Sequence, residues 1–341
     1  MKQLQNSSSN REEQGLLSEL HSIDMSIKLQ TASADLELFP DFVVKKVDLE
    51  LQRPPHNAHT ELEILNTLSH KNVMRLIDHS ITTGYVTFKF PRYRCDLNQY
   101  MDEHWKSKYN PYLLDNNSKK SYSNTLPLDD SLLILKQVSE ALSYIHANGI
   151  IHRDIKPHNI MMNSCNEVVL GDFGISYNRK IDNPAKTCDC STSIYKAPEL
   201  LFSISDYQYE IDIWALAIML SQLWNDKAES KSSTSKLINI DLEECSDIKL
   251  VLTLFHQLGK PSTEDWPQIA RNDSFHGMFG NLTSDNYIDR LPLETKLQKV
   301  FEWMPLIKDN SKLALMWLSM VKFNREQRIS AKHILEIMAT I

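Results

Sequence analysis

The chain has 341 residues, of which 42% are hydrophobic, and this is enough apolar material for one large core or two modest ones. Its formal net charge of -7 excludes the basic field that nucleic-acid binding requires, and it contains no run of about 18 apolar residues to span a bilayer. We therefore expect two lobes or domains and no nucleic-acid or membrane partner.

Residues 1–22 are rich in Ser, Asn, Gln and Glu and show little apolar periodicity. This composition predicts a flexible N-terminal tail. Because the segment lacks the apolar region of a secretory signal, we expect a protein of the cytoplasm, the nucleus or both, in which the five cysteines are free thiols.

Short strand-like segments dominate between residues 23 and 93. Their residues are apolar or alternate between apolar and polar, and Thr83–Gly84 marks a turn between two of them. These segments are residues 42–47, 75–81 and 85–90. One helix interrupts them, and it is expected to begin near Pro54–Pro55 because proline suits the first turn of a helix.

The pattern after residue 93 is mainly helical. Apolar residues recur at helical spacing in 97–105 and 129–148, and the whole of 94–341 is expected to be mostly α-helix. Two polar stretches, residues 106–127 and 225–236, interrupt it. Their Lys and Ser content predicts surface insertions.

A group of polar residues with phosphoryl-transfer chemistry follows the longer helix. Moving a γ-phosphoryl group requires metal ligands, a cation near the phosphates and a group that orients the attacking hydroxyl. Asp154 is the candidate acceptor for the proton of that hydroxyl, and Lys156 can neutralise the γ-phosphate. Asn159 and Asp172 offer oxygen ligands to Mg²⁺.

Two motifs carry a resemblance to a known family. Ile151–Asn159 reads Ile-His-Arg-Asp-Ile-Lys-Pro-His-Asn, and Asp172–Gly174 reads Asp-Phe-Gly. Together they resemble the catalytic motifs of eukaryotic protein kinases, and the resemblance covers roughly residues 40–340. It implies ATP and Mg²⁺ as cofactors and an α+β, bilobal fold. A small β-rich N-lobe with one helix would span 23–93, and a larger helical C-lobe would span 94–341.

The same resemblance implies the type of kinase and the residues that support its site. Lys156–Pro157 resembles the serine/threonine type, in which Thr192 is expected to contact Asp154 and Lys156. The family pairs Glu199 of the Ala-Pro-Glu motif with a late arginine, here Arg328, in a buried ion pair. Asp212 resembles the aspartate that anchors the catalytic loop.

The nucleotide-binding residues are also implied by the resemblance. Lys45 matches the lysine that holds the α- and β-phosphates, and Glu61 matches its helical partner. Lys46 and Glu63 are the alternatives, although each is expected to face another side of its element.

Around the adenine, Phe90 occupies the gatekeeper position. Pro91 keeps a carbonyl to offer to the base, and Tyr93 offers an N–H. Val43 and Met161 are expected to bracket the ring.

Three features of the family are missing. No glycine occurs in residues 16–83, so the glycine-rich phosphate loop is absent, and the cyclin-binding helix sequence is also absent. Of the three arginines that surround a phosphothreonine in cyclin-dependent kinases, only Arg153 is kept, and Thr60 and Tyr177 replace the others. A phosphate on Thr187 would therefore meet one guanidinium where three are expected.

These departures, with three sequence fragments, resemble the single-subunit CDK-activating kinase of budding yeasts. The fragments are Pro54–Ala58, Asp172–Tyr177 and Ile194–Glu199. The resemblance implies a monomer that needs no cyclin and phosphorylates the activation-loop threonine of cyclin-dependent kinases. Two alternatives remain: another CDK-like kinase with a different protein substrate, and a pseudokinase scaffold, which the missing glycines favour.

Overall fold

The computed structural model describes residues 26–31, 33–108, 121–163, 166–180, 186–228, 235–240, 245–283 and 286–341. The expected tail, residues 1–22, lies outside them. The chain divides into two compact units, one formed by the residues up to His59 with Arg75–Arg92, and the other by Thr60–Met74 with Tyr93–Ile341. Both Tyr93 and most of the helix expected in the N-lobe thus belong to the second unit.

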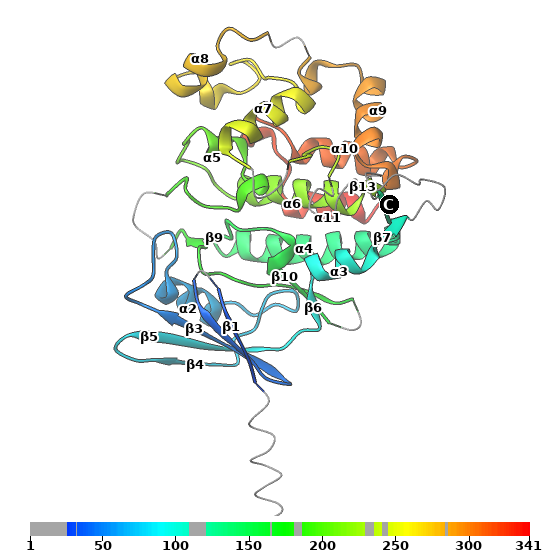
Figure 1. Cartoon of the computed structure of the whole chain (residues 1–341). Helices are drawn as coiled ribbons and strands as arrows, with labels where there is room; N and C mark the ends of the chain where they lie inside the picture. Colours follow the sequence, from blue (N-terminus) through cyan, green and yellow to red (C-terminus); the bar gives the residue numbers. More distant parts are fainter. Residues whose placement is uncertain are drawn as a thin grey trace, which may run out of the picture. The chain divides into compact units, whose positions relative to one another are not determined.

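The first unit is an antiparallel sheet in which β3 and β5 are central (Figure 1). Its strand order is β1-β2-β3-β5-β4, with the bounds β1 Ile27–Gln30, β2 Asp35–Leu38, β3 Phe42–Asp48, β4 Asp78–Ile81 and β5 Tyr85–Pro91. The buried side chains of Val47, Val86 and Phe88 gather on one face of β3 and β5, because successive side chains alternate between faces.

The turn between β1 and β2 forms without glycine. The N–H of Thr31 donates to the carbonyl of Ala34 at 2.9 Å, and the N–H of Ala34 donates to the Thr31 hydroxyl at 3.1 Å. These two hydrogen bonds close the turn, so that it does not depend on the conformational freedom of glycine. The two strands stay in register, with Gln30 opposite Asp35.

Helix α2 spans Ala58–Thr67. The prediction that it begins near Pro54–Pro55 was wrong, because that cis-linked pair precedes the helix. The side chain of Gln52 accepts a hydrogen bond of 2.7 Å from the Ala58 N–H, so a distant residue satisfies a donor of the first turn.

The second unit is mainly helical. Its helices are α3 Leu97–His104, α4 Leu128–Ala147, α5 Pro198–Leu201, α6 Glu210–Leu223, α7 Asp247–Leu258, α8 Asp273–Phe279, α9 Leu293–Trp303, α10 Ser311–Met320 and α11 Ala331–Met338. Its short strands are β6 Cys95–Asp96, β7 Trp105–Lys108, β8 Ser121–Asn124, β9 Ile150–Ile151, β10 Ile160–Met162, β11 Val168–Leu170, β12 Tyr177–Asn178 and β13 Lys227–Ala228. Helix α6 is apolar on all sides and is buried from Ile211 to Leu223, as expected for a helix at the centre of a core.

The two predicted insertions are joined at their edges. Strands β7 and β8 pair with each other, and β13 adds to β8 as a third strand. Asn124 donates from its side chain to the carbonyls of Leu223 and Asn225 at 3.1 and 2.9 Å. The prediction of surface insertions was therefore wrong for Leu126 and Asn225, which lie at the edges of the two stretches and are buried.

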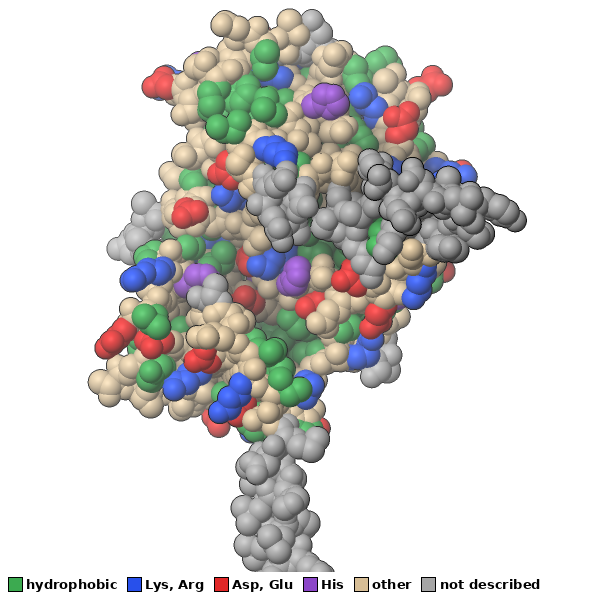
Figure 2. All heavy atoms as spheres, in the orientation of Figure 1, with side chains coloured by type: hydrophobic (Ala, Val, Ile, Leu, Met, Phe, Trp, Pro, Cys, Tyr) green, Lys and Arg blue, Asp and Glu red, His purple; other side chains and the backbone are tan. Residues whose placement is uncertain are grey.

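Exposed apolar side chains occur on α7 and α8, including those of Ile248, Leu252 and Met278. Figure 2 shows hydrophobic side chains gathered over this part of the molecule. Among the residues that the structure describes, no helix combines the length and apolarity needed to cross a membrane.

Candidate active site

The loop that carries Asp154 is fixed by a buried carboxylate on α6. Asp212 is 1% exposed, and its oxygens accept hydrogen bonds from the backbone N–H groups of His152 and Arg153 at 2.9 and 2.8 Å. His146, near the end of α4, places Nε2 at 2.9 Å from the same carboxylate. Asp212 therefore holds the backbone directly before Asp154, the place that the sequence implies for it. His146 was not predicted, because its spacing is also that of an ordinary helix residue.

Four predicted residues meet in one hydrogen-bonded group. The Thr192 hydroxyl donates to Oδ1 of Asp154 at 2.7 Å, and Lys156 Nζ lies 2.8 Å from both the Thr192 hydroxyl and Oδ2 of Asp154. Asn159 donates from Nδ2 to Oδ2 of Asp154 at 2.9 Å. The carboxylate is thus oriented by three side chains, each from a different position of the chain.

The β10–β11 hairpin brings Asn159 and Asp172 close in space. Ile160 pairs with Leu170, and the Gly171 N–H donates to the Asn159 carbonyl at 2.9 Å. Because Asn159 uses its amide nitrogen on Asp154, its amide oxygen is the atom able to ligate a cation. An amide oxygen and the Asp172 carboxylate are hard ligands that suit Mg²⁺.

Two residues of the site have left-handed backbone conformations. Arg153 has a φ of 69° and Asp172 a φ of 58°, which are uncommon values for residues with a side chain. The ring of Phe173, which is 1% exposed, packs edge-on against His152 with centroids 5.0 Å apart. This packing holds the residue that follows Asp172 in the core.

The first unit aligns three of the predicted nucleotide-binding residues. Val43 lies directly opposite Phe90, and Lys45 lies opposite Phe88, so Val43, Lys45 and Phe90 share one face of the sheet. Lys46 lies on the other face, is exposed and stacks over the Tyr85 ring at 3.7 Å. Lys45 thus faces the buried side of β3, and this supports it over Lys46.

Burial also separates the two candidate glutamates. Glu61 is 2% exposed within α2, whereas Glu63 is exposed to solvent. A buried carboxylate requires a partner, while an exposed one is stable in water. The contrast favours Glu61.

The remaining predicted adenine-site residues lie on or close to strands of the two units. Pro91 ends β5 opposite Phe42, where its missing N–H costs no ladder bond at the end of the strand. Met161 lies on β10 between Asp96 and Val169, and Tyr93 is half-buried ahead of β6.

The Glu199 and Arg328 side chains are in contact. The two guanidinium nitrogens of Arg328 donate to the two carboxylate oxygens at 2.7 and 3.1 Å, and the side chains are 1% and 0% exposed. Arg328 also donates to the backbone carbonyls of Lys322 and Glu210. The pair therefore joins the start of α5 to the segment before α11.

Thr187 lies in the activation segment, the stretch between Asp172 and Glu199. The Thr187 hydroxyl accepts a hydrogen bond from the Asp189 N–H at 3.0 Å, while the Arg153 guanidinium donates to the Ile175 carbonyl and the Tyr207 hydroxyl. Tyr207, which the sequence did not indicate, contacts this segment twice: its hydroxyl donates to the Thr187 carbonyl, and its own carbonyl accepts from Lys186 Nζ. Burial and the neighbouring charge of Arg179 lower the pKa of Lys186.

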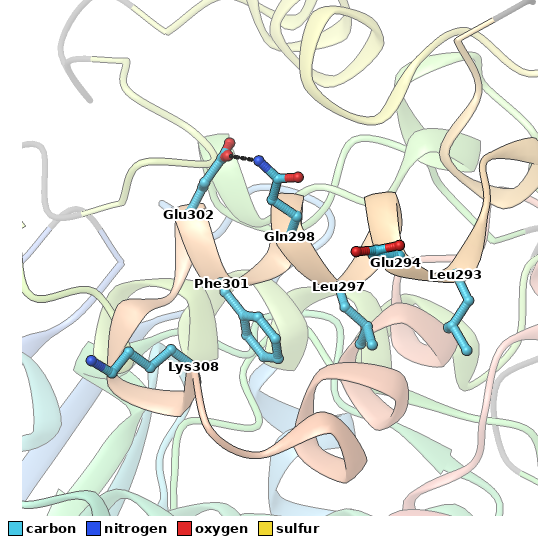
Figure 3. A pocket seen from close by; sticks show the side chains of 7 residues that line it. All are labelled: Leu293, Glu294, Leu297, Gln298, Phe301, Glu302 and Lys308. Atoms are coloured by element: carbon cyan, nitrogen blue, oxygen red, sulfur yellow. Dashed lines mark hydrogen bonds between the residues drawn. The ribbon is translucent and has the colours of Figure 1, made fainter.

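An open groove of about 850 Å³ lies along α9. Figure 3 shows Leu293, Leu297 and Phe301 on one side of this helix, while Gln298 and Glu302 form a hydrogen bond of 3.1 Å on the other. None of the predicted site residues lines this groove.

Comparisons with known proteins agree with this geometry. The protein kinase domain model matches residues 40–338. Serine/threonine-protein kinase CAK1 of Saccharomyces cerevisiae is 30% identical over 361 aligned residues, which cover 93% of this chain and 98% of the relative. Serine/threonine-protein kinase csk1 of Schizosaccharomyces pombe is 27% identical over 67% of this chain and 68% of its own length. The chain therefore belongs to the protein kinase family, as a serine/threonine kinase with the α+β bilobal fold.

Proposed function

We propose that this protein transfers the γ-phosphoryl group of Mg-ATP to the activation-loop threonine of cyclin-dependent kinases, and that it does so as a monomer without a cyclin. In the classification of enzymes, we place this activity in the class that also holds the cyclin-dependent kinases. The main support is the Asp154–Thr192–Lys156–Asn159 group, in which every member is already hydrogen-bonded in the isolated chain. Because contacts within one chain position these four residues, the group favours action without a partner.

The likeness of the whole chain to CAK1 supports the choice of substrate, as do the fragments that resemble single-subunit CDK-activating kinases. The match extends over nearly the full length of both proteins. A relation of this extent covers the helical unit in addition to the catalytic motifs, and the helical unit is where a protein substrate is usually bound.

The residues of the site have distinct roles in the proposed reaction. Asp154 orients the substrate hydroxyl and accepts its proton, while Lys156 neutralises negative charge on the transferred phosphoryl group. Thr192 holds these two side chains in place through its hydroxyl. Asn159 and Asp172 would hold Mg²⁺, which supplies charge neutralisation at the phosphates when it is bound.

The proposed activity is tested with a catalytically inactive cyclin-dependent kinase as substrate, because such a substrate cannot phosphorylate itself. The purified chain and Mg-ATP are incubated with this substrate, both free and cyclin-bound, and phosphorylation is mapped by mass spectrometry. We expect phosphate on the activation-loop threonine of the cyclin-free substrate.

Two controls define the result. A substrate with alanine at that threonine should take up no phosphate, and the Asp154→Ala enzyme should transfer none. Transfer to other proteins without transfer to this threonine would refute the proposed substrate. Light scattering at the assay concentration tests the oligomeric state, and we expect a monomer.

A pseudokinase scaffold is the second candidate, and the glycine-free β1–β2 turn is the observation that favours it. The turn is closed by hydrogen bonds of Thr31 and Ala34, so it is less free to adapt to phosphates than a glycine loop. A scaffold would bind Mg-ATP and transfer phosphate to no protein. Measuring ATP binding and transfer on the same sample distinguishes the two candidates.

A further inference from the structure

The guanidinium of Arg153, which the family uses to bind an activation-segment phosphate, is already engaged in this protein. Arg153 is 6% exposed, and its Nε donates to the carbonyl of Ile175 at 2.5 Å. Its Nη1 donates to the hydroxyl of Tyr207 at 3.3 Å, and the guanidinium lies 5.6 Å from the centre of the Tyr177 ring. The charge of Arg153 is therefore satisfied by neutral protein groups.

Tyr207 connects this arginine to the activation segment. Its side chain is fully buried, and its hydroxyl donates to the backbone carbonyl of Thr187 at 2.6 Å while accepting from Arg153. The same hydroxyl lies 3.7 Å from Sγ of Cys190. One phenol thus uses both its donor and its acceptor capacity to link the catalytic loop with residues 187–190.

Lys186, the residue before Thr187, also contacts Tyr207. Its Nζ donates to the carbonyl of Tyr207 and lies 5.0 Å from the centre of the Tyr207 ring and 5.7 Å from that of Tyr177. Such placements of an ammonium over aromatic rings are attractive. The ammonium group of Lys186, which belongs to the activation segment, therefore lies between Tyr177 and Tyr207 and contacts a carbonyl and two aromatic rings.

The backbone before Tyr207 is fixed from another side. Both terminal nitrogens of Arg325 donate to the Asp206 carboxylate, at 2.7 and 2.5 Å, and this bidentate geometry limits rotation of the pair. Arg325 lowers the pKa of the Asp206 carboxyl, which stays charged near neutral pH. Tyr207 therefore extends from an anchored segment.

We propose that Tyr207 is a positioning residue whose hydroxyl replaces the activation-segment phosphate, joining Arg153 to the Thr187 carbonyl and so ordering the segment without phosphorylation. This inference rests on the proposed kinase function, and it names the group that makes the kinase independent of an upstream kinase. The link uses the backbone carbonyl of Thr187, while the Thr187 hydroxyl accepts a hydrogen bond from the Asp189 N–H.

The test compares Tyr207→Phe with Tyr209→Phe in the full chain. Each change removes one phenolic oxygen, but within the described residues the Tyr209 hydroxyl accepts its hydrogen bond from the exposed Arg179 side chain, at 3.1 Å. We expect Tyr207→Phe to lower kcat/KM for a protein substrate by about tenfold to a hundredfold, because it removes one hydrogen bond from the buried Arg153 guanidinium and one from the Thr187 carbonyl. The KM for ATP should stay unchanged. Tyr209→Phe should change kcat/KM by less than about twofold.

A second substitution distinguishes this link from a general loss of stability. In the Tyr207→Phe background, Arg153 loses a partner, and Thr187→Glu supplies a carboxylate close to it. We expect the Tyr207→Phe/Thr187→Glu double variant to recover at least about a third of the lost kcat/KM, since an ion pair with the introduced carboxylate replaces the hydrogen bond that Arg153 has lost. Thr187→Glu alone should bring no gain. If Tyr207 had a purely structural role, Thr187→Glu would not restore activity in the Tyr207→Phe variant.

Hydrogen exchange tests the link separately from the activity. We expect the amides of residues 187–190 to exchange faster in Tyr207→Phe than in the parent chain or in Tyr209→Phe, whether or not the chain phosphorylates cyclin-dependent kinases. Unchanged exchange of these amides overturns the inference, as does full activity of Tyr207→Phe. If exchange rises as expected while the parent chain transfers no phosphate, the link is supported and the proposed function fails.

Discussion

Glu199→Gln is expected to lower the free energy of unfolding by about 3 kcal/mol. The substitution keeps the size of the side chain and removes its charge, so the Arg328 guanidinium stays buried without a counter-ion. Removing one member of a buried ion pair costs roughly 3–5 kcal/mol. The lower end of that range applies because Arg328 keeps its hydrogen bonds to the carbonyls of Lys322 and Glu210.

Thermal and urea unfolding, followed by tryptophan fluorescence, measure this loss. The matched control is Glu336→Gln, because Glu336 forms an ion pair with Lys332 in which the two side chains are 54% and 80% exposed. Exposed pairs contribute about 0–1 kcal/mol, so this control should unfold like the parent chain. If Glu199→Gln is no less stable than Glu336→Gln, the argument from buried charge is refuted.

A double substitution adds a further check. Glu199→Gln/Arg328→Met removes both charges, and buried ion pairs are often replaced by apolar groups at little cost. The double variant should therefore be less destabilised than the sum of its two single variants. An additive result would indicate that the two side chains do not interact.

Three further predictions concern catalysis. Asp154→Ala and Asp172→Ala should each lower kcat by about 10²–10⁴-fold or more and leave the melting temperature close to that of the parent chain; a large drop in melting temperature would indicate a structural role instead. Asp212→Asn should lower kcat by roughly tenfold or more with an unchanged KM for ATP, because it weakens the hydrogen bonds to the loop before Asp154. An effect on ATP binding alone would contradict this. Thr187→Ala should leave activity within a few fold, because Arg153 is engaged elsewhere; a loss of about a hundredfold in a kinase assay would contradict this account.

The catalytic group was predictable from the sequence because phosphoryl transfer allows few residue types at fixed spacings. Asp154, Asn159 and Asp172 lie within one short stretch, and the geometry of a single hairpin brings them together. The placement of Lys45 and Lys46 on opposite faces of β3 was also predictable, since neighbouring residues on a strand face opposite sides. Local rules were sufficient in these cases.

Other contacts were not predictable because they join distant residues through the backbone. Tyr207 acts on the carbonyl of Thr187, which every residue type carries, so no side-chain pattern at position 187 indicates the contact. The start of α2 was misplaced for a similar reason: Gln52 satisfies its first donor from outside the helix, and proline at the first turn is only one way to begin.

The small sheet formed by β7, β8 and β13 affects how the protein can be shortened for biochemical work. A deletion of residues 106–127, drawn from sequence composition, would remove the strand to which Lys227–Ala228 is hydrogen-bonded. It would also remove Asn124, which binds two carbonyls at the end of α6. A cut between Lys108 and Ser121 keeps both strands and their register. The two polar stretches are therefore coupled through β8 and β13, and a truncated chain should be designed around both together.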